Sequence, residues 1–226
     1  MSVILVVAAH PDDEVLGCGG TIAKLSAEND IYTLILGEGV TSRNNSVGKQ
    51  ADELKSLKKD ILSANKILGT KKVFIKDLPD NKFDTVPLLD IIKIIETLIS
   101  ELKPEYVFTH HYGDLNIDHR IVYDAVLTAC RPVEQCPVKK LVSFEVPSST
   151  EWNSHSLINC FHPTIFENID KTIDKKTDAM SAYRNEIRLN PHSRSPEKIR
   201  ALAQVRGAVA GMEFAEAFML IREFKD

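Results

Sequence analysis

Residues 3–20 read VILVVAAHPDDEVLGCGG, and this stretch decides the fold. Val3 to Ala9 form a continuous apolar run rich in β-branched residues, which predicts a strand buried on both faces. From Glu14 to about Ala27 the apolar residues recur at helical spacing, which predicts a helix. A buried strand that leads directly into a helix is typical of the first unit of a parallel α/β sheet.

The rest of the chain continues this alternation of strands and helices. Further strands are predicted at 31–36, 72–75, 106–109 and 140–146, and further helices at 50–68, 86–102, 118–129, 170–188 and 195–207. A polar loop is predicted at 147–152, and the apolar segment 213–222 has no firm assignment. We therefore predict a Rossmann-like three-layer α/β fold with a mostly parallel sheet, formed as a single domain over 1–226.

The composition excludes several classes of protein. With 28 Lys+Arg against 32 Asp+Glu the net charge is −4, which argues against a nucleic-acid partner. The first apolar run ends after about eight residues with no basic residue before it, so neither a signal peptide nor a membrane span is predicted. The four cysteines form no CxxC pair, and a cytoplasmic location is expected. Assembly into a homo-oligomer is left open.

The polar residues that follow the first strand predict a metal site. Ligands of parallel α/β sheets bind beyond the carboxyl ends of the strands, where His10, Asp12 and Asp13 are placed. Two adjacent carboxylates repel each other, and a cation removes that cost. Catalytic Zn²⁺ takes three His, Asp or Glu ligands and keeps one position for water. His119, in the donor-rich loop after the strand 106–109, is predicted to be the third ligand beside His10 and Asp13.

These motifs resemble those of a known family. HPDDE at 10–14 after a buried strand, GCGG at 17–20 and NIDH at 116–119 are similar to segments of the PIG-L/LmbE-like N-acetylglucosaminyl deacetylases, and the likeness extends over most of the chain. The resemblance implies an enzyme that hydrolyses the N-acetyl group of a small N-acetylated amino sugar or its conjugate, giving free amine and acetate. It also implies Zn²⁺ as the cofactor.

The resemblance further implies a role for each site residue. His10, Asp13 and His119 would bind zinc, and Asp12 would be the general base. Asp118, beside His119, could orient an imidazole from behind the metal ligands. His110, at the end of the strand 106–109, would have a supporting position of the same kind.

Asn116 is a departure from the family pattern. The family often has a His at this position, which is thought to stabilise the transition state. An Asn amide can donate a hydrogen bond to an oxyanion but cannot carry a positive charge. If charge is needed there, His110, His111 and His192 are the candidates, and the oxyanion is expected to rest on a nearby donor such as Asn116 or His192.

Three loop residues are predicted to contact the substrate. Arg43 lies where family members place a substrate-contacting Arg, although a solvated loop cation explains it equally well. Asp80 and Asn81 follow a predicted strand and could bind sugar hydroxyls, although ordinary turn chemistry also accounts for a Pro-Asp-Asn sequence.

Three other functions compete with the deacetylase. A dinucleotide-binding domain would need a third glycine at position 22, which is Ile22. A magnesium-dependent phosphohydrolase could use Asp12, Asp13, Asp114 and Asp118, although two histidine ligands favour zinc. A non-catalytic sugar-binding relative is the third alternative, which Asn116 leaves open.

Overall fold

The strand β1 (Val3–Ala8) forms an inner strand of the sheet, as its apolar residues require. In the computed structural model, Ile4 to Ala8 are all buried, and β1 pairs in parallel with β2 (Asp30–Gly37) on one side and β4 (Tyr106–His110) on the other. A strand flanked on both sides and covered on both faces has no surface where polar side chains would be solvated.

The structure describes residues 1–40, 47–133, 136–154, 156 and 159–225. One seven-stranded sheet in the order β3-β2-β1-β4-β5-β7-β6 organises them. The remaining strands are β3 (Lys72–Leu78), β5 (Lys140–Phe144), β6 (Ile165–Asn168) and β7 (Ala215–Glu223). The helices are α1 (Asp13–Leu25), α2 (Val47–Leu68), α3 (Leu88–Leu102), α4 (Ile117–Ala129), α5 (Ile173–Ala182) and α6 (Pro196–Ala210), with short 3₁₀ turns η1 (Phe83–Thr85) and η2 (Thr150–Trp152).

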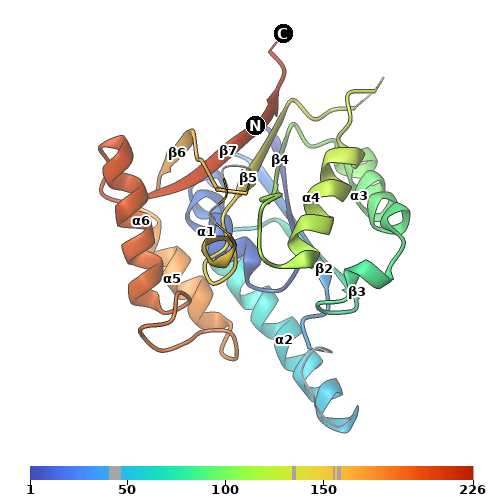
Figure 1. Ribbon diagram of the computed structural model, residues 1–226, viewed down its shortest axis with the longest axis horizontal. Coiled ribbons are helices and arrows are strands. Elements are labelled where there is room, and N and C mark those ends of the chain that lie inside the picture. The colour runs from blue at the N-terminus through green and yellow to red at the C-terminus, as the bar shows by residue number, and fades with distance from the viewer. Residues whose placement is uncertain (41–46, 134–135, 155, 157–158, 226) are drawn as a thin grey trace.

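Helices cover both faces of the sheet. On one side α3 and α4 lie together, and on the other α1, α2, α5 and α6 form a larger group, as Figure 1 shows. Two apolar cores fill the spaces between the layers. Leu5, Val7 and Val107 belong to the core beneath α3 and α4, whereas Ile4 and Val6 belong to the core beneath α1 and α2. The alternating directions of the β1 side chains thus serve both layers, and the predicted three-layer α/β fold is confirmed.

The carboxyl-terminal third differs from the sequence prediction. The segment 213–222, left unassigned, contains β7, which runs antiparallel to β5. The four-residue strand β6, which was not predicted, pairs antiparallel with β7 at the edge of the sheet. The helix predicted at 170–188 is only Ile173–Ala182, and its continuation is a loop. Among the described residues, none of the helices combines the length and the apolar character that a membrane span requires.

The helix α1 is kinked at Cys18, where φ and ψ are −148° and 24°. A buried ion pair from the carboxyl-terminal third joins its two halves. The ammonium of Lys176 on α5 donates to the carbonyl oxygen of Leu16 at 2.8 Å, and the carboxylate of Glu216 on β7 accepts from the backbone N–H groups of Gly20 and Thr21 at 2.9 and 2.7 Å. Polar backbone groups that the kink would otherwise leave unpaired are therefore satisfied by side chains.

Gly17 allows α1 to pack closely on the sheet. A Cβ atom at this position would lie 2.3 Å from Cδ2 of the fully buried Phe144. We expect Gly17→Ala to lower the free energy of unfolding by about 1–3 kcal/mol, because the ring has to move within a packed core. Thermal unfolding measures this, and Gly19→Ala is the comparison, since its Cβ would meet Val15 at 3.2 Å and should cost less. Equal melting temperatures for Gly17→Ala and the wild type would contradict the prediction.

Candidate metal centre and active site

The candidate site lies at the carboxyl ends of the neighbouring strands β1 and β4. From β1 the chain proceeds to β2 and β3 on one side of the sheet, whereas β4 and β5 lie on the other side. The crevice at such a reversal is the usual ligand site of an open α/β sheet. His10 and Asp12 occupy the turn that follows β1, Asp13 begins α1, and His119 lies in the first turn of α4.

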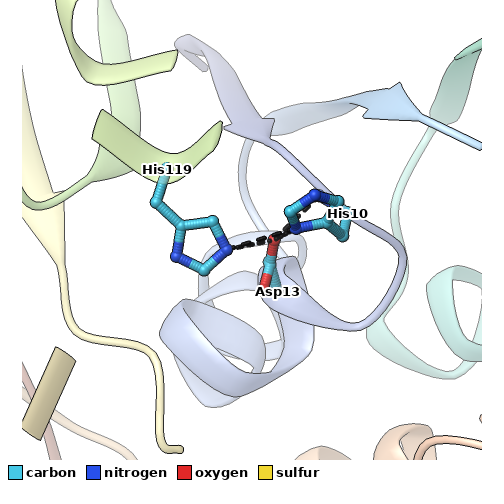
Figure 2. Close-up of side chains that lie close together, drawn as sticks. All are labelled: His10, Asp13 and His119. Carbon is cyan, nitrogen blue, oxygen red and sulfur yellow. Dashed lines mark hydrogen bonds and ion pairs between the residues drawn. The ribbon is translucent and has the colours of Figure 1, made fainter. Parts of the chain in front are cut away.

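One atom from each of His10, Asp13 and His119 faces a common point, as Figure 2 shows. Nδ1 of His10 lies 3.5 Å from Oδ2 of Asp13 and 3.3 Å from Nε2 of His119. The same nitrogen of His119 lies 3.3 Å from Oδ2 of Asp13. The structure thus brings together the three residues that were predicted to bind a metal, from positions 109 residues apart in the chain.

The spacing of these three atoms fits one four-coordinate ion. Bonds from zinc to imidazole nitrogen and carboxylate oxygen are about 2.1 Å long, so two ligands at a tetrahedral angle lie about 3.4 Å apart. The observed separations of 3.3, 3.3 and 3.5 Å lie on either side of that value. The triangle can therefore hold a divalent cation and leave a coordination position for another ligand.

Carboxylates around the two imidazoles favour positive charge at this point. Burial opposes the charged form of His10, but its hydrogen bonds with Asp118 and Asp13 outweigh burial and raise its pKa to about 10. Burial opposes the charged form of His119 in the same way, but the charge of Asp13 and contact with Asp114 raise its pKa to about 9. Surroundings that favour imidazolium also favour a divalent cation, which displaces the proton from the nitrogen that it binds.

A carboxylate also lies behind each imidazole. Nε2 of His10 is 2.9 Å from Oδ2 of Asp118 and 3.4 Å from Oδ1 of Asp80, and Nδ1 of His119 is 3.2 Å from Oδ1 of Asp114. Such partners fix which ring nitrogen carries the proton and how the ring is turned. Asp118 therefore contacts the imidazole of His10 and not that of His119, its neighbour in sequence. The carboxylate in contact with the His119 imidazole is that of Asp114.

A second group of possible metal ligands shares His10. It consists of Nε2 of His10 and the carboxylates of Asp80 and Asp118, all within 4.8 Å of one another. Asp118 additionally accepts a hydrogen bond from the backbone N–H of Phe83 at 3.0 Å. A neutral imidazole has a lone pair on only one nitrogen, so His10 in that form can bind an ion in one group only. Two nitrogen donors and the adjacent Asp12 favour the group that contains His119.

Asp12 adopts a strained backbone conformation beside the candidate metal ligands. Its φ of 97° lies in the left-handed region, and although it stands at the N-cap of α1, its side chain makes no capping hydrogen bond. Its carboxylate instead accepts from Nη1 of Arg194 at 2.8 Å. Burial, together with Asp13 and Glu186, raises the pKa of Asp12 well above its usual value, while Arg194 acts in the opposite direction. The raised pKa of this carboxylate is closer to neutral pH, as suits a general base.

The site opens into a polar cavity of about 170 Å³. Acidic side chains line much of it, including Asp80 and Glu186 in addition to Asp12 and Asp13. Asn81 and Asn116 also line it, so the two residues predicted to bind substrate at 80 and 81 reach the same space as the candidate metal ligands. Arg43, the third predicted substrate contact, lies outside the described residues.

The amide of Asn116 is held at both ends. Its Oδ1 accepts from the backbone N–H of Asp118 at 2.8 Å and so caps α4, and its Nδ2 donates to Oδ1 of Asn81 at 3.0 Å. The amide nitrogen of Asn116 carries two hydrogens, so Asn116 has a second N–H in addition to the one that it donates to Asn81. The cap fixes Asn116 at the cavity wall, close in sequence to His119.

The three histidines considered as sources of positive charge lie outside the cavity lining. Nε2 of the fully buried His110 accepts from the backbone N–H of Ala9 at 2.8 Å, and burial lowers the pKa of His110 well below its usual value. Burial lowers the pKa of His111 as well, and its Nε2 lies 3.0 Å from the carbonyl oxygen of Asn159. Desolvation and Arg194 lower the pKa of His192. His110 stacks on His119 with ring centroids 4.0 Å apart, so it supports that imidazole by packing.

Sequence reasoning missed Arg194 and the role of Asp114. Arg194 lies in the segment PHSRS at 191–195, from which His192 but not Arg194 was predicted as a site residue, and its contact with Asp12 spans 182 positions. Asp114 accepts hydrogen bonds from the hydroxyls of Ser149 and Thr150, and although burial opposes ionisation, contact with His119 lowers its pKa to about 2. The position of Asp114, five residues before His119 in the sequence, was the signal that could have indicated its role.

Comparisons with known proteins identify the family of this chain and agree with its fold. The sequence model of the PIG-L family, described as GlcNAc-PI de-N-acetylase, matches residues 5–130. "Uncharacterized deacetylase YaiS" of Escherichia coli is 32% identical over 173 residues, which are 74% of this chain and 81% of that protein. The chain therefore belongs to the PIG-L family.

Two further proteins show how far the similarity extends. "Probable N-acetyl-alpha-D-glucosaminyl L-malate deacetylase 2" of Bacillus cereus is 27% identical over 191 residues, which are 81% of this chain and 83% of that protein. The structure of N,N'-diacetylchitobiose deacetylase from Pyrococcus horikoshii superposes with a TM-score of 0.80 at 17% identity, covering 97% of this chain and 84% of that one. The second similarity supports the fold alone.

Proposed function

We propose that this protein is a zinc-dependent deacetylase that hydrolyses the N-acetyl group of an N-acetylated amino sugar or its conjugate. The observation that carries the proposal is the triangle of His10, Asp13 and His119, whose donor atoms are 3.3–3.5 Å apart, with the buried carboxylate of Asp12 next to it. A hydrolase of this type needs a metal site with an open position and a base beside it.

The ligand types favour zinc over magnesium. Two imidazole nitrogens and one carboxylate oxygen suit zinc, whereas magnesium prefers oxygen ligands in octahedral geometry. When bound, zinc would lower the pKa of a coordinated water from 15.7 to about 7 and polarise the amide carbonyl. His10, Asp13 and His119 would hold the ion, and Asp118 and Asp114 would keep the two imidazoles in the orientation that binding requires.

The protein's own residues account for the movement of protons. Asp12 accepts a proton from the attacking water and transfers it to the nitrogen of the leaving amine. As the C–N bond breaks, acetate and the free amine are formed. Asn116 lines the cavity beside the proposed metal ligands, and an N–H of its amide donates to the oxyanion that develops on the carbonyl oxygen.

The cavity and the relatives together support the substrate class. Asp80, which lies on the Nε2 side of His10, offers a carboxylate to sugar hydroxyls, and Asn81 in the same cavity offers an amide. Two of the related proteins are named for deacetylation of N-acetylated sugars or their conjugates. We therefore propose a small amino-sugar substrate, with Arg43 as an additional contact.

Metal analysis and acetate release test this function directly. The purified protein is measured for zinc content and assayed with N-acetylglucosamine, diacetylchitobiose and N-acetylglucosaminyl malate. We expect about one zinc per chain and stoichiometric release of acetate and amine from at least one compound. A protein that binds no zinc, or that releases phosphate from p-nitrophenyl phosphate with magnesium alone, would refute the proposal. Zinc binding without turnover of any N-acetyl sugar would support the non-catalytic alternative.

His119→Ala should remove both the metal and the activity. The substitution leaves two donors, His10 and Asp13, which are too few for a stable catalytic zinc site. We expect zinc content to fall below about a tenth of the wild-type value, consistent with loss of a ligand that metal affinity depends on. His162→Ala is the control, because His162 lies in the loop before β6 and does not line the cavity. Full zinc occupancy in His119→Ala would exclude this residue as a ligand.

A further inference from the structure

Arg194 is the one Lys or Arg among the described residues that line the cavity. Four carboxylates line the same space, those of Asp12, Asp13, Asp80 and Glu186. The Arg194 side chain is about one quarter exposed, whereas that of Asp12 is almost fully buried. The guanidinium therefore lies at the boundary between the cavity and the buried base, where it contributes positive charge to an acidic site.

Contacts from three parts of the chain fix the guanidinium. Nη1 donates to Oδ2 of Asp12 at 2.8 Å, and Nε donates to the hydroxyl of Ser148 at 2.7 Å. Nη1 also lies 3.6 Å from Oε2 of Glu186. The planar guanidinium directs its N–H groups at fixed angles, so a bond at Nε restricts where Nη1 points. Ser148, in the loop after β5, thereby aims Arg194 at Asp12.

The backbone on either side of Arg194 is also held. Its N–H donates to Nδ1 of His192 at 3.1 Å. The next residue, the fully buried Ser195, caps α6 by accepting from the backbone N–H of Lys198 at 3.3 Å, with Pro196 at the first helical position. His192 therefore contributes to the site by shaping the turn that presents Arg194.

Asp12 needs such a partner because its own backbone is strained. A non-glycine residue with φ of 97° is strained, and such strain persists only where surrounding contacts over-determine the conformation. The carboxylate does not cap α1, so among the described residues Arg194 is the hydrogen-bond donor that holds it at the cavity.

We propose that Arg194 is a positioning residue, which holds the carboxylate of Asp12 beside the metal ligands and supplies the positive charge of the cavity. The inference rests on the proposed deacetylase function for its catalytic consequence. Arg194 lies outside residues 5–130, which the family model matches.

The first test separates positioning of the base from substrate binding. In Arg194→Met we expect kcat to fall about 100-fold, because displacement of a catalytic group by about 1 Å has an effect of this size. Zinc content should stay at the wild-type value, and KM should change by less than about threefold. Arg194→Lys should recover only part of kcat, because an ammonium cannot bond to Ser148 and Asp12 with the same fixed geometry. Arg188→Met, an exposed residue of the same loop, is the control.

A double-mutant cycle gives a readout that does not depend on activity. Arg194→Met leaves the buried Asp12 carboxylate without its ion partner and should lower the melting temperature, whereas Asp12→Asn introduced into that variant should restore much of the loss. Additive shifts in melting temperature, or a kcat of Arg194→Met within twofold of wild type, would overturn the proposal. If the wild type deacetylates no compound of the panel, the proposed function fails, and the melting cycle still decides whether Arg194 holds Asp12.

Discussion

Asp12→Asn should retain zinc and lose activity by about 10²–10⁴-fold in kcat, the range expected when general base catalysis is removed. An Asn side chain has nearly the same shape as Asp, but its amide cannot accept a proton at neutral pH. Because the triad His10, Asp13 and His119 is complete without Asp12, its ability to bind metal should remain.

Zinc content and kcat measured on the same preparation check this expectation. Asp124→Asn on α4 is the matched control, since it removes an exposed carboxylate and should leave both quantities unchanged. Loss of zinc in Asp12→Asn would make Asp12 a ligand, and full activity would remove it from the proton pathway. Retained zinc with reduced turnover is the combination that supports a base.

Lys176→Met should cause the largest loss of stability. Lys176 and Glu216 are both buried, and their charged atoms lie 2.5 Å apart. Removal of one partner of a buried ion pair costs about 3–5 kcal/mol, because the remaining charge is left without compensation. The carbonyl oxygen of Leu16 also loses its hydrogen-bond donor. In a chain of this length each kcal/mol corresponds to roughly 2–4 °C, so a fall of about 6–20 °C in melting temperature is expected.

Two variants make this stability test specific. Lys175→Met removes a neighbouring exposed ammonium from the same helix and should leave the melting temperature nearly unchanged. Lys176→Met combined with Glu216→Gln should recover part of the loss, because the uncompensated charge is gone. A melting temperature for Lys176→Met within about 2 °C of wild type would show that this pair contributes little.

The amino-terminal part of the fold could be predicted because its signals are local. An uninterrupted apolar run followed by His-Pro indicates the strand β1, and a continuous apolar stripe indicates the helix α3. The ends of both elements were therefore predicted to within two residues. The strand β7 gave no such signal. Its residues Ala215–Phe218 are buried on both faces, whereas the remainder is half-buried or exposed, so neither a constant run nor an alternation results. The strand β6 is too short, at four half-buried residues, to form a pattern.

The residues of the candidate site likewise fall into those that the sequence could predict and those that it could not. His10, Asp12 and Asp13 could be assigned from one motif at the end of a strand, and His119 from a second motif, since parallel strands deliver both to one edge of the sheet. Arg194 could not, because no local pattern indicates which of many loop cations will meet a carboxylate 182 positions away. That contact depends on the packing of α5 and α6 against the sheet, which sequence periodicity does not specify.

The kink in α1 has a consequence for how the protein is made. A nascent chain that has emerged as far as residue 130 already contains His10, Asp13 and His119, yet it lacks Lys176 and Glu216, which complete the helix that begins at Asp13. During synthesis the proposed metal ligands are therefore made many residues before the groups that stabilise the helix holding Asp13. Mature metal affinity is therefore expected only after translation of β7, and a protease cut before Glu216 would disable a centre built from residues far upstream.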